Sequence, residues 1–204
     1  MVSTKFIKQT KQLELTMTQM GQDCLKGLSF CRHALYDRDK TLIQEINELH
    51  EDVSANGREC EQICMRILLL QHPVAKDLRK ITVATNTIRD MTRIMDQEKE
   101  VADLVCRIQD TDVEIDGTIH DLFSIAKEMI SGAISAYMQK DDDKADSLYI
   151  DTKELYIEKL AAKTGNAETL VDLLLVGKYL ERICDHAVNI AKWVLFQKKG
   201  VYEE

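Results

Sequence analysis

The chain has 204 residues, of which 45% are hydrophobic and only 5% aromatic, with one proline and eight glycines. Sandwiches, barrels and doubly wound sheets need many short connections, so this scarcity of turn formers excludes them and favours a few long helices. Lys and Arg number 27 against 35 Asp and Glu, which gives a net charge of −8. An acidic surface repels phosphate backbones and therefore disfavours a nucleic-acid partner.

No apolar run approaches the roughly 18 to 20 residues that a membrane-spanning helix needs. The densest runs are residues 67–70 and 173–176. The first eight residues also lack the apolar segment and cleavage site of a secretory signal. We therefore expect a soluble cytoplasmic protein with no membrane insertion.

In the first half of the chain, apolar residues recur at spacings of three and four, which predicts three helices. The first covers residues 13–35 and stops at the charged segment 37–39. The second covers residues 42–70 and ends before Pro73, because proline cannot continue a helix interior. Pro73 is expected in the first turn of the third helix, which runs to about residue 110.

The second half follows the same plan after a polar linker at residues 109–112. Apolar spacing predicts helices over residues 115–133, 148–160 and 170–194. Gly165 suits the C-terminal cap of the second of these helices.

An internal repeat is visible in the residues as well as in the pattern. Residues 90–96 align with residues 179–185 through a shared Arg-Ile-x-Asp core. The sequence therefore predicts an all-α protein made of two tandem, pseudo-symmetric three-helix bundles of long antiparallel helices, residues 1–110 and 111–204.

The cysteines and most methionines fall at helical spacing inside apolar stretches, so we expect them in the core of a protein from a reducing compartment. They are Cys24, Cys31, Cys60, Cys64, Cys106 and Cys184, and Met17, Met20, Met65, Met91, Met95 and Met129. Cys60 and Cys64 lie one turn apart, where disulfide geometry is poor, and a metal or redox pair is the alternative interpretation. Gly57 inside the second helix marks a bend or a close contact.

Three segments carry a resemblance to a known family. They are the Gln-His-Pro-Val-Ala-Lys-Asp-Leu-Arg stretch at residues 71–79, the degenerate Thr-Arg-Ile-Met-Asp at 92–96, and the dozen residues 180–191 that begin Leu-Glu-Arg-Ile-Cys-Asp-His-Ala. In these stretches the chain resembles the PhoU family of phosphate-signalling regulators. The resemblance covers both predicted bundles in their order.

The resemblance implies a function as well as a fold. A member of this family is expected to be a homodimer in the cytoplasm, peripheral to a membrane-bound phosphate transporter and a sensor histidine kinase. Its expected role is negative regulation of the phosphate-starvation response through binding of the transporter ATPase or the kinase, with no enzymatic activity. Accessory regulation of a sodium-phosphate carrier is the alternative partner assignment.

The resemblance also implies a metal site, because some members hold metal on acidic ExxxD and DxxxD motifs. Glu181 and Asp185 keep both acids in the second bundle, and their spacing puts them on one helix face. Such carboxylates suit a di- or trivalent cation such as iron, zinc or magnesium. In the first bundle Thr92 replaces the glutamate, and Asp96 remains.

The partner helices depart from the family motif. Counting from the neighbouring turns puts non-acidic residues at the expected positions: His50 and Ser54, and Thr152 and Tyr156. A shifted register would bring in the acids Asp151, Glu154 and Glu158. His50 is also a candidate nitrogen ligand beside Asp96. The alternative is that Glu181 with Arg182, and Arg93 with Asp96, form ion pairs between helices, and that His186 is a hydrogen-bonded polar residue.

Two further readings remain open. A metal-storing or metal-sensing helical protein would use Glu181, Asp185 and nearby acids. A di-iron oxidase ranks last, because such bundles use Glu-x-x-His pairs and the chain has none. Finally, lysines cluster at Lys5, Lys8 and Lys11 and again at Lys192, Lys198 and Lys199. Such clusters are typical of solvated helix ends, and a docking surface is the alternative.

Overall fold

The computed structural model describes residues 4–71, 73, 75–108, 115, 117–139 and 167–200. These residues form five long helices and no strand: α1 (Thr4–Asp37), α2 (Thr41–Gln71), α3 (Lys76–Ile108), α4 (Gly117–Gln139) and α6 (Ala167–Lys199). The all-α prediction is confirmed. The expected linker at 109–112 and the expected helix at 148–160 lie outside the described residues.

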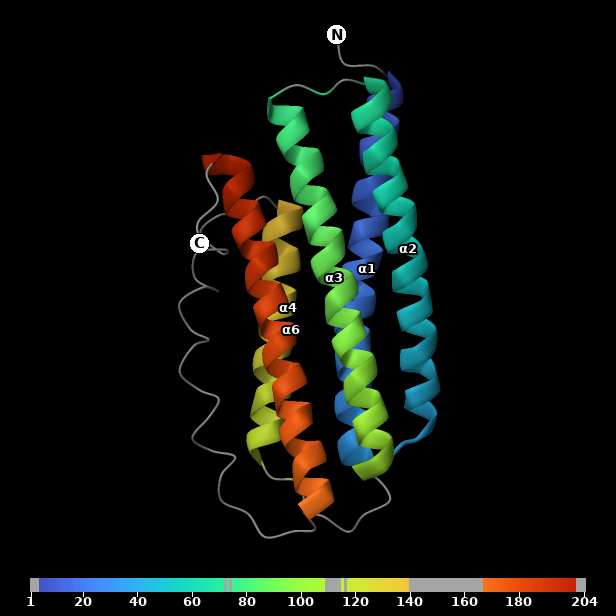
Figure 1. Cartoon of the computed structure of the whole chain (residues 1–204), viewed down its shortest axis with the longest axis vertical. Coiled ribbons are helices and arrows are strands. Elements are labelled where there is room, and N and C mark those ends of the chain that lie inside the picture. Colours follow the sequence, from blue (N-terminus) through green and yellow to red (C-terminus); the bar gives the residue numbers. More distant parts are fainter. Residues whose placement is uncertain are drawn as a thin grey trace.

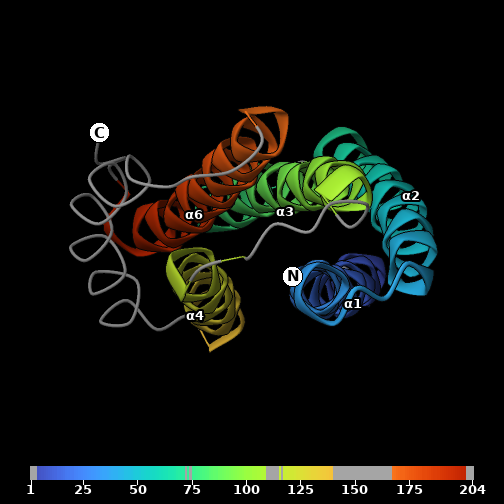
Figure 2. The same cartoon turned by 90° about the horizontal axis from the view of Figure 1, so that it is seen from below.

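All five helices run along the long axis of the molecule (Figure 1). Seen from below, α6, α3 and α2 form one row, while α4 and α1 lie side by side in a second row (Figure 2). The most extensive contact in the described part is between α3 and α6, the third helix of each predicted bundle, and α1 also packs on α4. The two bundles therefore meet through equivalent helices.

A side-chain cap explains the start of α2. The Asp39 carboxylate accepts a hydrogen bond from the backbone N–H of Thr41 at 3.0 Å and from its hydroxyl at 2.6 Å. The preceding Arg38 has a φ of 55°, a left-handed conformation that a helix cannot continue. The stop predicted at residues 37–39 is confirmed.

The turn between α2 and α3 differs from its prediction. Pro73 was expected inside the first turn of the third helix, but α3 begins at Lys76. Ala75 between them has a φ of 41°, which breaks the helical run after the proline. Its carbonyl accepts a hydrogen bond from the N–H of Arg79 at 3.0 Å, so Ala75 immediately precedes the regular hydrogen bonding of α3.

One hydrophobic core joins the two bundles. Buried residues of all five helices, among them Met17, Ile46, Ile88, Ile130 and Ile183, belong to a single packed cluster. Shape complementarity over such a core fixes the helices relative to one another. None of the described helices is long and apolar enough to cross a membrane.

Met65 and Cys106, both expected in the core, lie outside it, whereas the close contact expected at Gly57 is confirmed. Met65 is 58% exposed and Cys106 is also exposed, because each lies just beside the apolar stripe of its helix. The other five cysteines are buried. A Cβ at Gly57 would lie 3.0 Å from the hydroxyl oxygen of Thr92, so this glycine permits the close approach of α2 and α3.

Candidate functional site

The first-bundle site centres on Asp96, where α2 and α3 face each other. Its Oδ1 lies 3.1 Å from Nε2 of His50, as the count back from Pro73 anticipated. Its Oδ2 accepts a hydrogen bond from Arg93 at 3.1 Å. These residues line a cavity of about 260 Å³ whose wall is completed by Gln97, Lys99, Glu100, Tyr179 and Arg182. Both oxygens of the Asp96 carboxylate are therefore occupied by nitrogen partners.

The position where the motif has a glutamate offers no metal ligand in this bundle. The Thr92 hydroxyl donates to the carbonyl of Ile88 at 3.0 Å and faces Gly57. Across the described residues, no group of three or more His, Cys, Asp or Glu side chains is arranged to hold a metal ion. The residues around Asp96 thus do not fit a metal centre, because Thr92 supplies no carboxylate and Arg93 already pairs with Asp96.

The second-bundle pair has a different environment. Glu181 is bound by Lys178 at 2.5 Å, one turn away on the same helix, and not by Arg182. Burial raises the pKa of Asp185, and the negative charge of Glu181 raises it further, against the opposing charges of Lys178, His186 and Arg182. Two carboxylates that repel each other in this way would gain from a shared cation. The candidate partner acids Asp151, Glu154 and Glu158 lie outside the described residues.

A histidine joins the two bundles beside this pair. His186 Nδ1 lies 2.9 Å from Oδ1 of Asp90, and both side chains are mostly buried. The prediction of a hydrogen-bonded polar residue is confirmed. The repeat that aligns residues 90–96 with 179–185 relates Asp90 to Tyr179 and His186 to Gln97. Tyr179 and Gln97 both line the cavity beside Asp96. The α3 to α6 interface thus follows the pseudo-symmetry of the sequence.

The sequence reasoning missed a buried carboxyl group. Glu98 is 0% exposed, and neither of its oxygens has a hydrogen-bond partner in the described structure. Burial raises its pKa well above the ordinary value, so the side chain is held towards its neutral form. It fits because the facing residue on α1 is Gly27, where a Cβ would overlap the carboxylate and lie 2.7 Å from the Met95 methyl group.

The thiols around Glu98 bind helix backbone. The Cys31 thiol lies 3.2 Å from the carbonyl oxygen of Glu98, and the Cys24 thiol lies 3.4 Å from that of Met91. Burial raises both pKa values. On α2, burial raises the pKa of Cys60 to about 12, with a smaller contribution from Cys64. None of the six cysteines forms a disulfide bond, and protonated buried thiols are poor nucleophiles and metal ligands.

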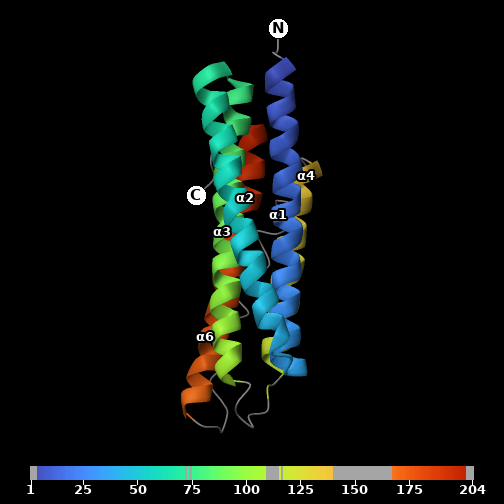
Figure 3. The same cartoon turned by 90° about the vertical axis from the view of Figure 1, so that its right-hand side faces the viewer.

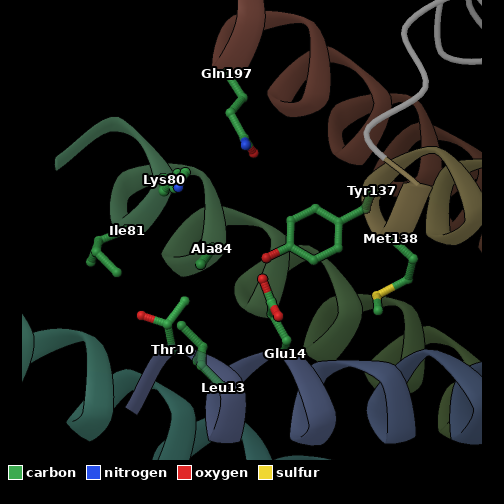
Figure 4. Close-up of a pocket in the computed structure, with 9 residues that line it drawn as sticks. All are labelled: Thr10, Leu13, Glu14, Lys80, Ile81, Ala84, Tyr137, Met138 and Gln197. Carbon is green, nitrogen blue, oxygen red and sulfur yellow. The ribbon is translucent and has the colours of Figure 1, made fainter. Parts of the chain in front are cut away.

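A second cavity, of about 140 Å³, lies where α1, α3, α4 and α6 meet (Figure 4). Tyr137 points from α4 towards Glu14 of α1, and its hydroxyl lies 3.3 Å from the sulfur of Met17. Burial, followed by nearby Cys64 and Glu14, raises the pKa of Tyr137. Lys80 and Gln197 complete the polar rim. The volume suits a few water molecules.

These features define a class of protein: an all-α chain of two related bundles that meet through equivalent helices, with polar groups at the junction. The sequence pattern of the PhoU domain matches this chain twice, at residues 17–105 and 119–194. The chain belongs to the PhoU family.

Relatives and solved structures agree over nearly the full length. The "Phosphate-specific transport system accessory protein PhoU homolog" of Borreliella burgdorferi is 27% identical over 95% of this chain and 96% of its own. The protein of the same name from Zymomonas mobilis is 28% identical over 92% of this chain and 84% of its own. The crystal structure of PhoU from Pseudomonas aeruginosa superposes with a TM-score of 0.86 at 25% identity, covering 96% of this chain and 100% of that one.

Proposed function

We propose that this protein regulates phosphate uptake and phosphate-starvation signalling as a non-enzymatic accessory protein. The observation that carries the proposal is the full-length match, in sequence and in fold, to proteins named as accessories of a phosphate-specific transport system. This chain is a helical body in which one hydrophobic core joins all five described helices. Such a body suits binding to protein partners.

The mechanism is differential binding. An accessory protein shifts a transporter or kinase between two states only by its difference in affinity for those states. We assign the partners as the ATPase of a phosphate transporter, a sensor histidine kinase, or both, with the chain in the cytoplasm as a homodimer. Bound to the partner's phosphate-replete state, it would hold uptake and starvation signalling at a low level.

A deletion strain tests this function. Loss of the gene is expected to derepress phosphate-starvation genes in phosphate-rich medium, and the tagged protein is expected to co-purify with the transporter ATPase or the kinase. Co-purification with a sodium-phosphate carrier would change the partner but keep the regulatory role. Unchanged phosphate uptake and unchanged expression in the deletion strain would refute the proposal.

We further propose a cation at Glu181 and Asp185, supported by the mutual repulsion of these two carboxylates. A bound di- or trivalent cation would supply charge neutralisation, while the two carboxylates would provide oxygen ligands. Metal analysis of protein purified without chelators is expected to find metal that Glu181→Ala with Asp185→Ala removes. Asp103→Ala with Asp121→Ala is the matched control on exposed acids. Metal content unchanged by the first pair would exclude these ligands.

A further inference from the structure

The two lysine clusters noted in the sequence lie at the same end of the molecule, one on α1 and the other on α6. The first turns of α1 lie beside the last turns of α2, and the last turns of α6 lie beside the first turns of α3, which separate α6 from α1 (Figures 1 and 3). The hydrogen bond from Arg79 of α3 to the carbonyl of Gln197 of α6, at 3.4 Å, fixes this register. We call this surface the basic end, defined as residues 4–12, 64–71, 75–81 and 192–200.

The basic end is opposite in charge to the rest of the protein. Its residues include ten Lys or Arg and one Asp, although the whole chain has 27 basic and 35 acidic residues. Lys8, Lys11 and Lys76 are exposed, and the single acid, Asp77, is 3.6 Å from Lys80. The four residues that follow Gly200 add two glutamates to the sequence, which leaves a clear positive excess.

Exposed apolar side chains gather on the same surface. Half of the large hydrophobic residues that are exposed in the described chain lie there, with exposed fractions of 59% for Ile7, 58% for Met65, 65% for Leu69, 60% for Leu70 and 44% for Leu78. They come from three helices whose ends project beyond those of α4 and α6 (Figure 1). The projecting tip of α1, α2 and α3 therefore carries seven of the ten basic residues together with these apolar side chains.

The combination of positive charge and exposed apolar side chains indicates which kind of partner the basic end binds. A symmetric pairing of two copies through the tip would place like charges against each other. A nucleic acid would use the lysines but leave the leucines in water, and the chain's net negative charge opposes a long polyanion. Anionic lipid headgroups attract lysine and arginine, and the adjoining acyl boundary accepts apolar side chains. Of these three occupants, the bilayer surface is the one that satisfies both features.

We propose that the basic end docks on the surface of a membrane rich in anionic phospholipid. Lys8, Lys11 and Lys76 contact the headgroups, and Leu69 and Leu70 enter the interfacial layer. The protein lies on the bilayer without spanning it, with its helices projecting away from the membrane. The proposal does not rest on the regulatory function, because lipid binding is measured with the purified protein alone.

Vesicle co-sedimentation tests the proposal. The full chain is incubated with vesicles of phosphatidylcholine, and separately with vesicles in which about a quarter of the lipid is phosphatidylglycerol. We expect binding only to the anionic vesicles and its loss at about 0.5 M salt, where charges are screened. Equal binding to both vesicles, or no binding to the anionic ones at low salt, would overturn it.

Matched variants locate the surface. Each basic residue near an anionic bilayer is worth roughly a factor of five in affinity, so Lys8→Gln with Lys11→Gln is expected to weaken binding roughly 25-fold. The matched control is Arg89→Gln with Lys127→Gln, which removes the same charge from exposed sites away from the tip. Equal losses in the two double variants would refute docking through this end.

The apolar contribution is tested separately. Leu69→Gln with Leu70→Gln should weaken binding at least tenfold, because two exposed leucines lose their apolar contact with the interface. Leu174→Gln changes a leucine that is 53% exposed near the opposite end of the molecule and should have no effect. If complementation of a deletion strain requires Lys8 and Lys11 while vesicle binding is absent, the tip binds an acidic protein and the lipid proposal is wrong.

Discussion

Glu98 is the residue whose environment is least expected in a helical core. A buried carboxyl without a hydrogen-bond partner costs free energy whether it is neutral or charged, and the charged form costs more. The protein tolerates it because Gly27 leaves room on α1 and because burial raises its pKa. The cost appears as a dependence of stability on pH.

The raised pKa of Glu98 makes the stability of the folded protein depend on pH. Between the ordinary pKa of 4.5 and the raised value, the folded protein holds a proton that the unfolded chain has released. The free energy of unfolding contributed by Glu98 is therefore complete below about pH 4.5 and falls as pH rises through the folded pKa. Glu98→Gln removes this fall and should be more stable than the wild type at about pH 8, by roughly 1 to 3 kcal/mol.

Urea unfolding at about pH 4.5, 6 and 8 measures the difference. Glu128→Gln changes an exposed glutamate on α4 and should follow the wild type at every pH. Parallel pH profiles for the wild type and Glu98→Gln would show that Glu98 does not carry the effect.

At the scale of elements, the structure depends on how closely pairs of helices approach. α1 meets α3 at Gly27 and Glu98 and α2 meets α3 at Gly57, while α3 and α6 combine buried apolar residues with two polar pairs, Asp90–His186 and Arg107–Asp172. Each contact includes small or polar residues on an otherwise apolar stripe. Substitutions there should act on helix separation more than on helix formation.

Gly27→Ala tests the approach of α1 and α3. The added methyl group overlaps the Glu98 carboxylate and the Met95 side chain, so we expect a loss of roughly 1 to 3 kcal/mol in the free energy of unfolding. Because Glu98→Ala removes the clash, the double variant should lose less than the sum of the single changes. Gly117, with nothing within 4 Å of its added Cβ, provides the control Gly117→Ala. Additive losses would place the strain elsewhere.

Asp172→Asn tests the junction of α3 and α6. Arg107 donates to both carboxylate oxygens of Asp172, at 2.8 and 3.1 Å, and the Asp172 side chain is 10% exposed. Losing one charge of this bidentate pair should cost about 1 kcal/mol or more. Asp103→Asn breaks an exposed pair with Lys99 and should cost less than about 0.5 kcal/mol. Similar thermal shifts for both variants would contradict the role of Asp172.

At the scale of the whole molecule, the two repeats pack together as one body. Most of their buried apolar residues form one cluster that includes all five helices, and the helices that the repeat relates to each other, α3 and α6, make the most extensive contact in the described part of the chain. A boundary in the sequence near residue 110 is therefore not a boundary in the packing. The division into two three-helix repeats, residues 1–110 and 111–204, stays a prediction.

This packing predicts a single unfolding transition. Neither bundle can open without exposing the apolar faces of α3 and α6, so the calorimetric and van't Hoff enthalpies should agree. Differential scanning calorimetry of the full chain measures both. Two resolved transitions, one for each repeat, would show that the interface is weaker than the packing indicates.

Much of this fold follows from local pattern. Spacing of apolar residues predicted the five described helices, because long amphipathic stripes are a local signal. It misplaced Pro73, since the left-handed conformation of Ala75 comes from the geometry of the turn. The spacing of apolar residues also placed Cys106 and Met65 in the core, because it does not define where the buried face of a helix ends.

The site was predictable in part. Counting along the chain placed His50 beside Asp96, because both lie on helices of regular rise. Glu98 was missed, although it lies on the apolar face of its helix between Met95 and Val101. A charged residue among apolar ones on that face was the sequence feature that could have revealed it. The partner of His186 could not be predicted, because Asp90 belongs to the other repeat and depends on how the bundles pack.

The contrast between one exposed and five buried cysteines has a practical consequence. A thiol-specific reagent should label Cys106 of the native protein at once, since the other thiols are shielded by the core and their pKa values, where raised, disfavour the reactive thiolate. Every further label added over time then records an opening of the core, distributed over α1, α2 and α6. The natural cysteines therefore report on opening of the core, and mass spectrometry can measure their labelling in the unmutated protein.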